Sequence, residues 1–496
     1  MTSSFHSLVL TQREFFLTGK PAELTHRKQQ LKRLRKAILD NKEFLCEAVH
    51  KDLKRDAKLN YPLELSSVII EIEYMLDNLE DWMAPLHVEK TFTTMLDTPQ
   101  VVPEPKGVVL VIGPWNYPLN TMLMPLVAVL AAGNTAILKP SEVAPNTAAA
   151  VDEVFSKAFE RNYLAVVQGG VGQTGELLSE KFDHIMFTGS APVARHILRA
   201  AAEHLTPCTL ELGGKSPVFI DSNVDIAITA RRLAWGKWLN CGQTCLAPDY
   251  VMLTNNVKPR LIEELKTVLI EYYGTNPAMS KDYSRIINES HFDRLCALLK
   301  SSAGKELHKL GQPDREDLFI PPTILDVEIG DSLMQSEIFG PILPILTVQS
   351  FDEAIDVIKR GEKPLAAYLF TRDEGKVKKL VSETYSGSVC INDVLFSANS
   401  VDTLPFGGVG ESGMGRYRGK FGFDEFSHQK AVLKRCFFGD GIAAGRYPPL
   451  TDQKLKSLQQ LTGKRRAVPR FLKALMPTVP YLLAGLLLGF LISRLV

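Results

Sequence analysis

The chain has 496 residues, which exceeds what one ordinary hydrophobic core holds, so roughly two to four domains are expected. Hydrophobic residues make up 45% of the sequence and charged residues 23%, which is an ordinary globular composition. The net charge of +1 excludes a global electrostatic field that would attract nucleic acid or acidic substrates.

The N-terminal part has helical character. Residues 22–55 and 62–84 are rich in Lys, Arg, Glu and Leu at helical spacing, and they predict two surface helices. Residues 87–103 carry Thr, Val and Phe around a turn signal at 97–99, which predicts a hairpin-like extension.

From Gly107 the sequence changes to apolar runs that end in glycine or proline. The run GVVLVIGP is typical of a strand that is buried on both faces, as in a parallel sheet, and residues 134–140, 163–170 and 184–190 have the same form. Helical segments such as LMPLVAVLAAG separate these runs. The alternation predicts a doubly wound, Rossmann-like α/β unit.

A second alternating series predicts another α/β domain over residues 210–415. Its expected strands include VMLTNN, LFIPPTILD, PILPILTVQS and LAAYLFT. Residues 427–436 then form an extended segment, which is expected to pair with the 87–103 hairpin or with another subunit.

Two of the seven cysteines, Cys241 and Cys245, lie four residues apart. No second Cys or His pair at metal-ligand spacing lies nearby, so no metal site is expected. The N-terminus has no basic start followed by an apolar core, so the thiols are expected to stay reduced. The pair is therefore either two inert buried thiols or one nucleophile and a bystander.

Four short motifs bear on this choice: GPWNYP (113–118), LELGGK (210–215), GQTC (242–245) and EIFGP (337–341). Together and in this order they resemble the aldehyde dehydrogenase superfamily, over about residues 10–435. The short N-terminus is similar to the class 3 branch of fatty and aromatic aldehyde dehydrogenases, whose members are typically dimers. The resemblance implies a Rossmann-like cofactor domain, an α/β catalytic domain, a bridging β extension and a homodimer.

The expected organisation has five parts. They are an NAD-binding domain (1–86 and 104–209), a catalytic domain (210–415), bridging or oligomerisation elements (87–103 and 416–440), a polar-to-basic linker (441–473) and a C-terminal membrane anchor (474–496).

The resemblance assigns a role to each catalytic candidate. Cys245 matches the nucleophile, because a thiolate adds readily to an aldehyde carbonyl, and Cys241 is the bystander. Asn116 and the backbone N–H of Cys245 match the donors that stabilise the resulting oxyanion. Glu211 matches the base for hydrolysis of the thioester. Asn116 could instead be a turn residue, and Glu211 a solvated residue at a strand end.

The resemblance also implies a nicotinamide cofactor. Lys139 and Glu142 match residues that bind the adenosine ribose, and a carboxylate there favours NAD over NADP, although the branch uses both. The remaining cofactor candidates are Gly189, Ser190 and Val193 near the pyrophosphate and Glu337 and Phe339 at the nicotinamide end. Glu337 and Phe339 could alternatively be a helix-end residue and a core residue.

One stretch departs from the family pattern. GSAPVA has Pro192 early in the expected helix and Ala194 where glycine is common. Proline is tolerated in a first helical turn, and alanine adds one methyl group where helix and strand approach, so the cofactor is expected to remain bound.

The C-terminal tail predicts membrane attachment. Residues 474–492 carry no charge, and as a helix they would span about 28 Å, which is close to the thickness of a bilayer core. Five basic residues precede this run, which predicts a cytosolic catalytic domain on a membrane such as the endoplasmic reticulum. Pro477 and Pro480 leave a second possibility, in which the segment covers the mouth of the active site.

These features predict NAD-dependent oxidation of medium- to long-chain aliphatic aldehydes to carboxylic acids at a membrane surface. Tyr117, Leu119 and Trp235 are candidates for an apolar substrate funnel, with core packing as the alternative for each. Two other functions stay open: an acyl-thioester reductase of the same fold, and a membrane-tethered interaction protein without activity. The intact base and nucleophile candidates argue against both.

Overall fold

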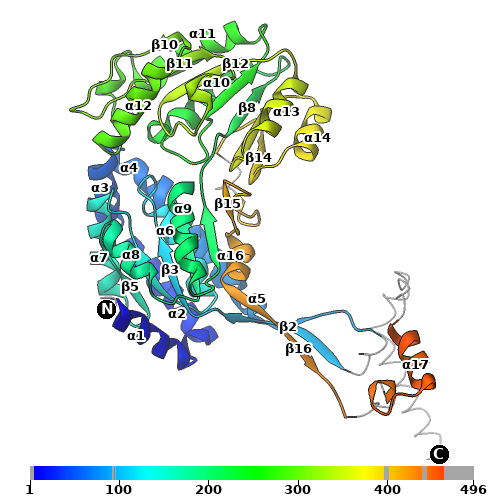
Figure 1. Cartoon of the computed structure of the whole chain (residues 1–496). Coiled ribbons are helices and arrows are strands. Elements are labelled where there is room, and N and C mark those ends of the chain that lie inside the picture. The colour runs from blue at the N-terminus through cyan, green and yellow to red at the C-terminus, as the bar shows by residue number, and fades with distance from the viewer. Residues whose placement is uncertain (1–4, 92–93, 95–96, 396–400, 438–443, 463–496) are drawn as a thin grey trace, which may run out of the picture. The chain divides into compact units, whose positions relative to one another are not determined.

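The computed structural model describes residues 5–91, 94, 97–395, 401–437 and 444–462. The chain divides into two compact units. One comprises Met1–Ala84 and Val102–Lys430, and the other comprises Pro85–Val101 and Ala431–Val496. Both large sheets belong to the first unit (Figure 1).

A six-stranded sheet follows the order β15-β7-β6-β3-β4-β5. Its strands pair in parallel, except that β15 runs antiparallel to β7. The predicted apolar runs form these strands, and β3, β4 and β6 are buried along their whole length, which confirms the Rossmann-like pattern. The strands are β3 (Val108–Ile112), β4 (Thr135–Lys139), β5 (Leu164–Val166), β6 (His184–Thr188), β7 (Cys208–Glu211) and β15 (Gly413–Met414).

A seven-stranded sheet follows the order β10-β11-β12-β9-β8-β13-β14. The strands from β11 to β14 in this order are parallel, and β10 is an antiparallel edge strand. They are β8 (Pro217–Ile220), β9 (Tyr250–Leu253), β10 (Lys305–Lys309), β11 (Thr323–Val327), β12 (Ile342–Thr347), β13 (Ala366–Phe370) and β14 (Ser388–Ile391).

The expected boundary at residue 210 falls inside a strand of the first sheet. Residues 208–211 pair with β6, so the chain leaves the first sheet after Glu211 and enters the second at Pro217. It returns to the first sheet at Gly413, because β15 pairs with β7. The change of sheet therefore occurs over residues 212–216.

A small sheet has the order β1-β2-β16, with strands at Leu86–His87, Thr98–Pro105 and Ser427–Lys434. In its hairpin, Leu86 pairs with Val101 and His87 with Gln100. The predicted hairpin is thus present, and the segment expected at 427–436 lies in the same sheet.

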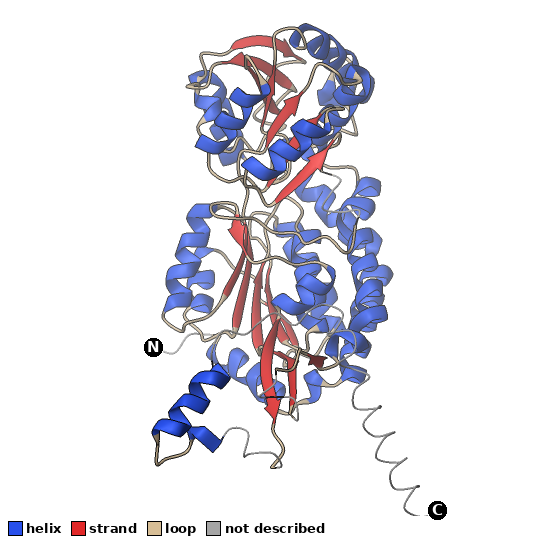
Figure 2. Ribbon diagram, turned by 90° about the vertical axis from the view of Figure 1, so that its right-hand side faces the viewer, coloured by secondary structure: helices blue, strands red, loops and turns tan. Residues whose placement is uncertain are grey.

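Helices cover both faces of the large sheets (Figure 2). The helices are α1 (His6–Leu17), η1 (Lys20–Ala22), α2 (Leu24–Asp40), α3 (Lys42–Leu53), α4 (Ala57–Asn60), η2 (Tyr61–Leu65), α5 (Ser66–Met83), α6 (Asn120–Ala131), α7 (Pro145–Ala158), α8 (Val171–Leu178), α9 (Ala191–Ala202), α10 (Ile226–Trp238), η4 (Leu239–Gly242), α11 (Lys258–Tyr273), η5 (Pro277–Met279), α12 (Glu289–Ser301), η6 (Ser332–Met334), α13 (Phe351–Arg360), α14 (Glu374–Glu383), α16 (Gly419–Glu425) and α17 (Asp452–Thr462).

The prediction of a single surface helix over residues 22–55 was wrong. Residues 22–55 form α2 and α3, because the chain leaves helical geometry at Asn41, whose side chain donates to the carbonyl of Ala37 at 2.8 Å. These helices also bury one face in the main hydrophobic core, where Leu34 and Ile38 are fully buried. Only their outer faces are solvated, as in an amphipathic helix.

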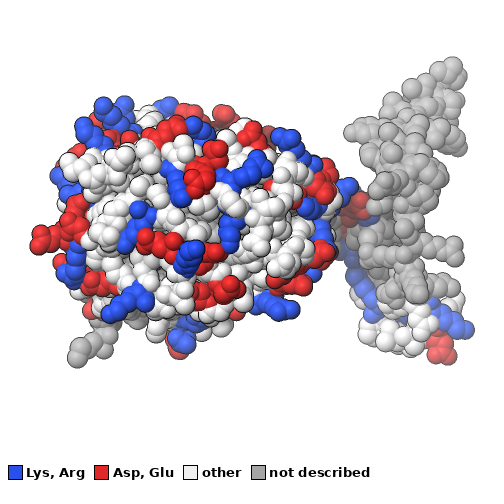
Figure 3. Space-filling view, turned by 90° about the horizontal axis from the view of Figure 1, so that it is seen from above, with Lys and Arg blue, Asp and Glu red and all other residues white. Residues whose placement is uncertain are grey.

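Acidic and basic side chains are interspersed over the face in Figure 3, in agreement with the small net charge. The expected linker at 441–473 contains the helix α17. The expected anchor at 474–496 lies outside the described residues. Within the part of the chain that the structure describes, no helix has the length and apolar character needed to cross a membrane.

The core predicts a contrast between two leucines. Leu110 is fully buried in the middle of β3, so Leu110→Ala should lower the free energy of unfolding by about 2–5 kcal/mol. Leu17 is exposed at the end of α1, and Leu17→Ala should change it by less than about 0.5 kcal/mol. Chemical denaturation of both variants measures the difference, and equal effects would contradict this placement of the core.

Candidate active site

The candidate active site lies between the carboxyl ends of strands in the six-stranded sheet and the amino ends of strands in the seven-stranded sheet. In the six-stranded sheet, the parallel strands β3, β6 and β7 end at Ile112, Thr188 and Glu211, so their carboxyl ends share one edge. In the seven-stranded sheet, Cys245 precedes β9 and Glu337 precedes β12, and both strands present their amino ends. Among the contacts between the edges, Cys245 Sγ donates to Glu211 Oε1 at 3.8 Å.

The turn before the candidate nucleophile has an unusual backbone. Asn240, Cys241 and Gly242 have φ angles of 52°, 56° and 72°, and this left-handed region is costly for the first two residues. The Asn240 side chain holds the turn, since Nδ2 donates to the carbonyl of Asn116 at 3.0 Å and to that of Gln243 at 3.2 Å. The turn is therefore fixed by contacts with the loop after β3.

The two neighbouring cysteines have different surroundings. Cys241 is fully buried, and burial raises the pKa of its thiol to about 12. Cys245 is half-buried. Burial, followed by the charges of Glu211 and Glu337, raises the pKa of the Cys245 thiol well above its ordinary value, while the backbone N–H groups of Cys245 and Leu246 oppose the rise. The Cys245 thiol thus needs a base to form a thiolate, and Glu211 is in contact with it.

The Glu211 carboxyl is enclosed by hydroxyl groups. Tyr417 donates to Glu211 Oε2 at 2.6 Å and Thr188 donates to the same oxygen at 3.1 Å, which leaves Oε1 for the thiol. Burial raises the pKa of Glu211, and the two hydroxyl donors oppose that rise. Glu211 is 2% exposed, so the alternative of a solvated residue at a strand end is excluded.

Asn116 lies in the loop between β3 and α6 and is buried. Its Nδ2 donates to the carbonyl of Gln243 at 3.1 Å, two residues before Cys245. A carboxamide nitrogen carries two hydrogens, so one remains for another acceptor. Asn116 thus braces the loop and retains a free donor next to the thiol-bearing turn.

The three funnel candidates occupy different environments. The Tyr117 hydroxyl lies 3.1 Å from Thr244 Oγ1, next to Cys245. Trp235 on α10 is 37% exposed. Leu119 is fully buried in the main core, which favours core packing over a place in a funnel.

Glu337 and Phe339 lie in the loop before β12. Burial raises the pKa of Glu337 to about 8, opposed by the backbone N–H of Gly214. A Cβ on Gly213 would lie 2.2 Å from Glu337 Oε2, so the first of the two glycines of LELGGK makes room for this carboxyl. The Phe339 ring meets the Trp115 ring edge-on, with 5.4 Å between the ring centroids.

The end of β4 carries the adenosine candidates. Lys139 is buried, and its Nζ lies 2.9 Å from Glu142 Oε2, whereas the Glu142 side chain is 43% exposed. A partly exposed carboxylate that is held by a buried lysine suits a ribose with a free 2′-hydroxyl.

The start of α9 suits a pyrophosphate. Ser190 precedes the helix and its side chain makes no capping hydrogen bond, so the first-turn N–H groups are open to an anion. A Cβ on Gly189 would lie 2.4 Å from the Phe187 ring, which accounts for glycine there. Val193 is exposed on the first turn, while the unusual Ala194 is buried. The start of α9, with Gly189, Ser190 and Val193, therefore fits the pyrophosphate of a dinucleotide.

Sequence motifs did not reveal several residues of the site. Tyr417 lies 206 positions from Glu211, and nothing in GMGRYRGK marks it as a partner. Arg55 and Glu64, which contact the Asn116 loop, lie in the two segments that were expected to be surface helices, Arg55 at the end of 22–55 and Glu64 near the start of 62–84. Thr188 follows a predicted strand directly, so its place at the sheet edge was a signal that could have been used.

Comparisons with known proteins agree on one family. A family model described as "Aldehyde dehydrogenase family" matches residues 12–432. Aldehyde dehydrogenase family 3 member A2 of Mus musculus is 44% identical over 90% of this chain and 92% of that protein, and the mouse "Aldehyde dehydrogenase, dimeric NADP-preferring" is 44% identical over 90% and 98%. A solved structure of Staphylococcus aureus AldH in a substrate-bound state has a TM-score of 0.88 and 39% identity, covering 92% of this chain and 99% of that one.

The Tyr417 hydroxyl predicts a shift in pH dependence. Its hydrogen bond lowers the pKa of Glu211, so Tyr417→Phe should raise that pKa by roughly one to two units, since a bond to a charged group is worth ~1.5–3 kcal/mol. A base works in its ionised form, so the acidic limb of the pH–rate profile for hydrolysis should move to higher pH. Tyr163→Phe is the control, because that buried hydroxyl has no hydrogen-bond partner among the described residues. Equal profiles for the two variants would contradict the assignment.

Proposed function

The chain belongs to the aldehyde dehydrogenase family, and from this premise we propose that it oxidises medium- to long-chain aliphatic aldehydes to carboxylic acids, with NAD, at a membrane surface. Its membership makes it an NAD(P)-dependent aldehyde dehydrogenase. The observation that carries the proposal is the contact of Cys245 with Glu211, beside the Asn116 amide.

We propose the following roles in the first half of the reaction. The Cys245 thiol gives its proton to Glu211 Oε1, which it contacts, and the sulfur forms a bond to the aldehyde carbon. The carbonyl oxygen becomes an oxyanion and accepts hydrogen bonds from Asn116 Nδ2 and the backbone N–H of Cys245. The nicotinamide cofactor, when bound, supplies the acceptor for the hydride. Loss of that hydride from the thiohemiacetal leaves a thioester on Cys245.

Hydrolysis completes the cycle. Glu211 releases its first proton to solvent, then takes a proton from a water molecule whose oxygen attacks the thioester carbon. The carbon–sulfur bond breaks and the carboxylic acid leaves. The proton on Glu211 then passes to the sulfur, which restores the Cys245 thiol and the Glu211 carboxylate. A reductase of acyl thioesters has no need for this base, so Glu211 favours hydrolysis over that alternative.

The preference for NAD rests on Glu142. Its carboxylate, held by Lys139, can accept from a free ribose 2′-hydroxyl and would repel a 2′-phosphate. The cofactor would be held by Gly189, Ser190 and Val193 at the start of α9 and by Glu337 and Phe339 at the reactive end. The name of one relative states a preference for NADP, so the ratio of the two cofactors is a direct measurement to make.

The substrate class and the membrane rest on the sequence of the tail. Residues 474–492 are uncharged and follow a basic cluster at 464–473, so the tail is suited to hold a cytosolic catalytic domain at the endoplasmic reticulum or a similar membrane. Long-chain aldehydes partition into bilayers, and a tethered enzyme meets them there. A homodimer through the small sheet is the proposed assembly, and the name of one relative includes the word dimeric.

Cysteine variants test the reaction. Cys245→Ser should abolish cofactor reduction with a long-chain aldehyde, while Cys241→Ser should keep most of it, because Cys241 is a fully buried thiol of raised pKa. The assay is absorbance of reduced cofactor, with circular dichroism to check folding. Equal loss from both changes in folded protein would contradict the nucleophile, and no reduction by the unaltered protein would favour a non-catalytic interaction protein.

Truncation tests the membrane proposal. A chain that ends before Lys464 should move to the soluble fraction and keep its activity on short aldehydes, because all the motifs lie before residue 440. Burial of large apolar side chains at ~1.5–3 kcal/mol each is sufficient for attachment of the full chain. Retention of the truncated chain in the membrane pellet would mean that another segment attaches it. Loss of chain-length discrimination in detergent would mean that the tail covers the substrate funnel.

A further inference from the structure

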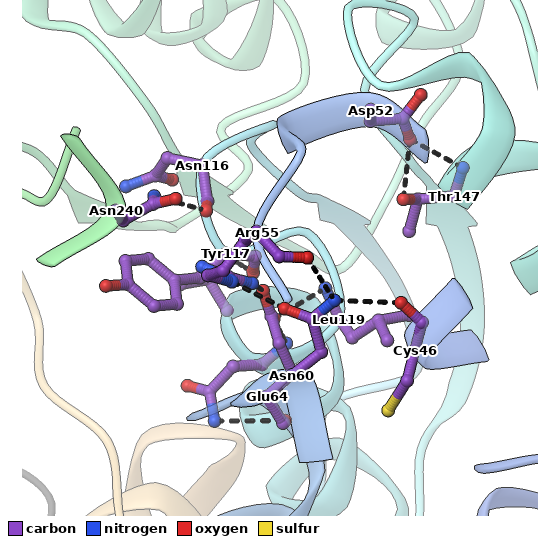
Figure 4. A network of polar contacts seen from close by, with 12 residues as sticks. Cys46, Asp52, Arg55, Asn60, Glu64, Asn116, Tyr117, Leu119, Thr147 and Asn240 are labelled. Carbon is purple, nitrogen blue, oxygen red and sulfur yellow. Dashed lines mark hydrogen bonds and ion pairs between the residues drawn. The ribbon is translucent and has the colours of Figure 1, made fainter. Parts of the chain in front are cut away.

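A buried ion pair lies beneath the loop that carries Asn116 (Figure 4). Arg55 and Glu64 are 1% and 0% exposed, and Arg55 Nη2 donates to Glu64 Oε1. Arg55 Nε also donates to Asn60 Oδ1 at 2.5 Å, and Asn60 Nδ2 donates to the carbonyl of Cys46 at 2.8 Å. The guanidinium is thereby fixed to the end of α4 and, through Asn60, to α3.

Glu64 connects this pair to the loop. Its Oε2 accepts from the backbone N–H groups of Leu119 at 3.2 Å and Asn120 at 2.9 Å, where the loop after β3 enters α6. Its own backbone carbonyl accepts from Asn120 Nδ2 at 3.3 Å. Burial raises the pKa of Glu64, and the Arg55 charge and the two N–H groups oppose that rise. One carboxylate thus fixes the start of α6 and the position of the guanidinium together.

Arg55 connects the pair to the nucleophile. Its guanidinium carbon lies 4.8 Å from the centre of the Tyr117 ring, so the planar cation rests against the ring. Arg55 Nη1 makes no hydrogen bond within the described residues. The Tyr117 hydroxyl lies 3.1 Å from Thr244 Oγ1, and Thr244 directly precedes Cys245.

A second set of contacts reaches the same turn from Asn116. Asn116 Nδ2 donates to the carbonyl of Gln243, and Asn240 Nδ2 donates to the carbonyl of Asn116. The loop at 113–119 and the turn at 240–245 are therefore joined at two points, Asn116 and Tyr117. The ion pair holds the loop from its opposite side.

We infer that Arg55 and Glu64 are positioning residues for the thiol, and that Arg55 acts through Tyr117 and Thr244. The inference rests on the thiol chemistry of the proposed function, but on neither the chain length of the substrate nor the membrane. It predicts a selective effect: loss of the Arg55 contact should slow formation of the acyl enzyme, which needs the thiol in position, more than its hydrolysis, for which Tyr417 and Thr188 hold the Glu211 base from other elements.

The test is a double-mutant cycle of Arg55→Lys and Tyr117→Phe in the full-length chain with a short soluble aldehyde such as propanal. Lysine keeps the charge opposite Glu64 but cannot present a planar fork. Arg55→Lys should slow the pre-steady-state burst of reduced cofactor by roughly ten- to a hundredfold, as expected for a small misplacement of reacting groups. Decay of the acyl enzyme, followed by mass spectrometry, should stay within about twofold of the unaltered chain. In the Tyr117→Phe background the same change should have little further effect on the burst.

Arg27→Lys is the matched control, because Arg27 is another buried arginine, on α2, that donates to the carbonyl of Ala131 far from the site. It should leave the burst unchanged, and its effect should add to that of Tyr117→Phe. Additive effects of Arg55→Lys and Tyr117→Phe, or equal slowing of the burst and of acyl-enzyme decay, would overturn the inference. Absence of any burst in the unaltered chain would instead overturn the proposed function.

Discussion

The buried carboxyl of Glu211 is the group on which the rest of the active site depends. It ends β7, and the antiparallel partner of that strand is β15, in which Gly413 pairs with Glu211. A Cβ on Gly413 would lie 2.2 Å from the carbonyl of Leu210, so this close pairing requires glycine. Because β15 returns here, the chain reaches Tyr417 four residues later and places its hydroxyl on the carboxyl. A solvated carboxylate in the same place could not be tuned in this way.

The site is built from charges that are costly to bury. Burial of an ion pair removes the hydration of both charges, and their mutual attraction does not always offset that free-energy cost. Removal of one partner, however, destabilises the folded protein by about 3–5 kcal/mol. Arg55 and Glu64 are therefore weak candidates for a role in stability alone. Their hydrogen bonds reach backbone groups at the entry to α6 and give the loop one orientation. Groups that are held in a fixed position at a reacting centre lower the activation free energy more than the same groups do in mobile positions.

The strands that the sequence predicts well share one property, which is burial on both faces. β3 and β4 are apolar runs with turn residues at their ends, so their local composition is enough to predict a buried strand. β10 has the sequence KELHK and is partly exposed at the sheet edge, so neither apolar content nor strict alternation marks it. β15 has two residues and exists because β7 offers it a partner 200 positions away.

The site residues likewise divide into those that a local motif marks and those that depend on contacts with distant parts of the chain. Cys245, Glu211 and Asn116 fall within short motifs that a resemblance identifies, and the structure brings these three together. Tyr417 and Arg55 lie in segments with no motif, and their contacts with the site span long sequence separations. A single sequence carries no record of such contacts, because they depend on the completed topology. For Leu119, beside a motif, the sequence left a place in the funnel and core packing both open, and the structure places it in the core.

The meeting of two opposite sheet edges has a consequence for the engineering of this fold. Cys245 comes from the amino edge of one sheet and Glu211 from the carboxyl edge of the other, so neither half holds a complete reaction centre. Activity therefore reports on the alignment of the two sheets, and thermostability reports on the integrity of each. Substitutions that fill the core of one sheet would delay melting more than they delay heat inactivation. Cross-links between the edges would protect catalysis even where they add little resistance to unfolding.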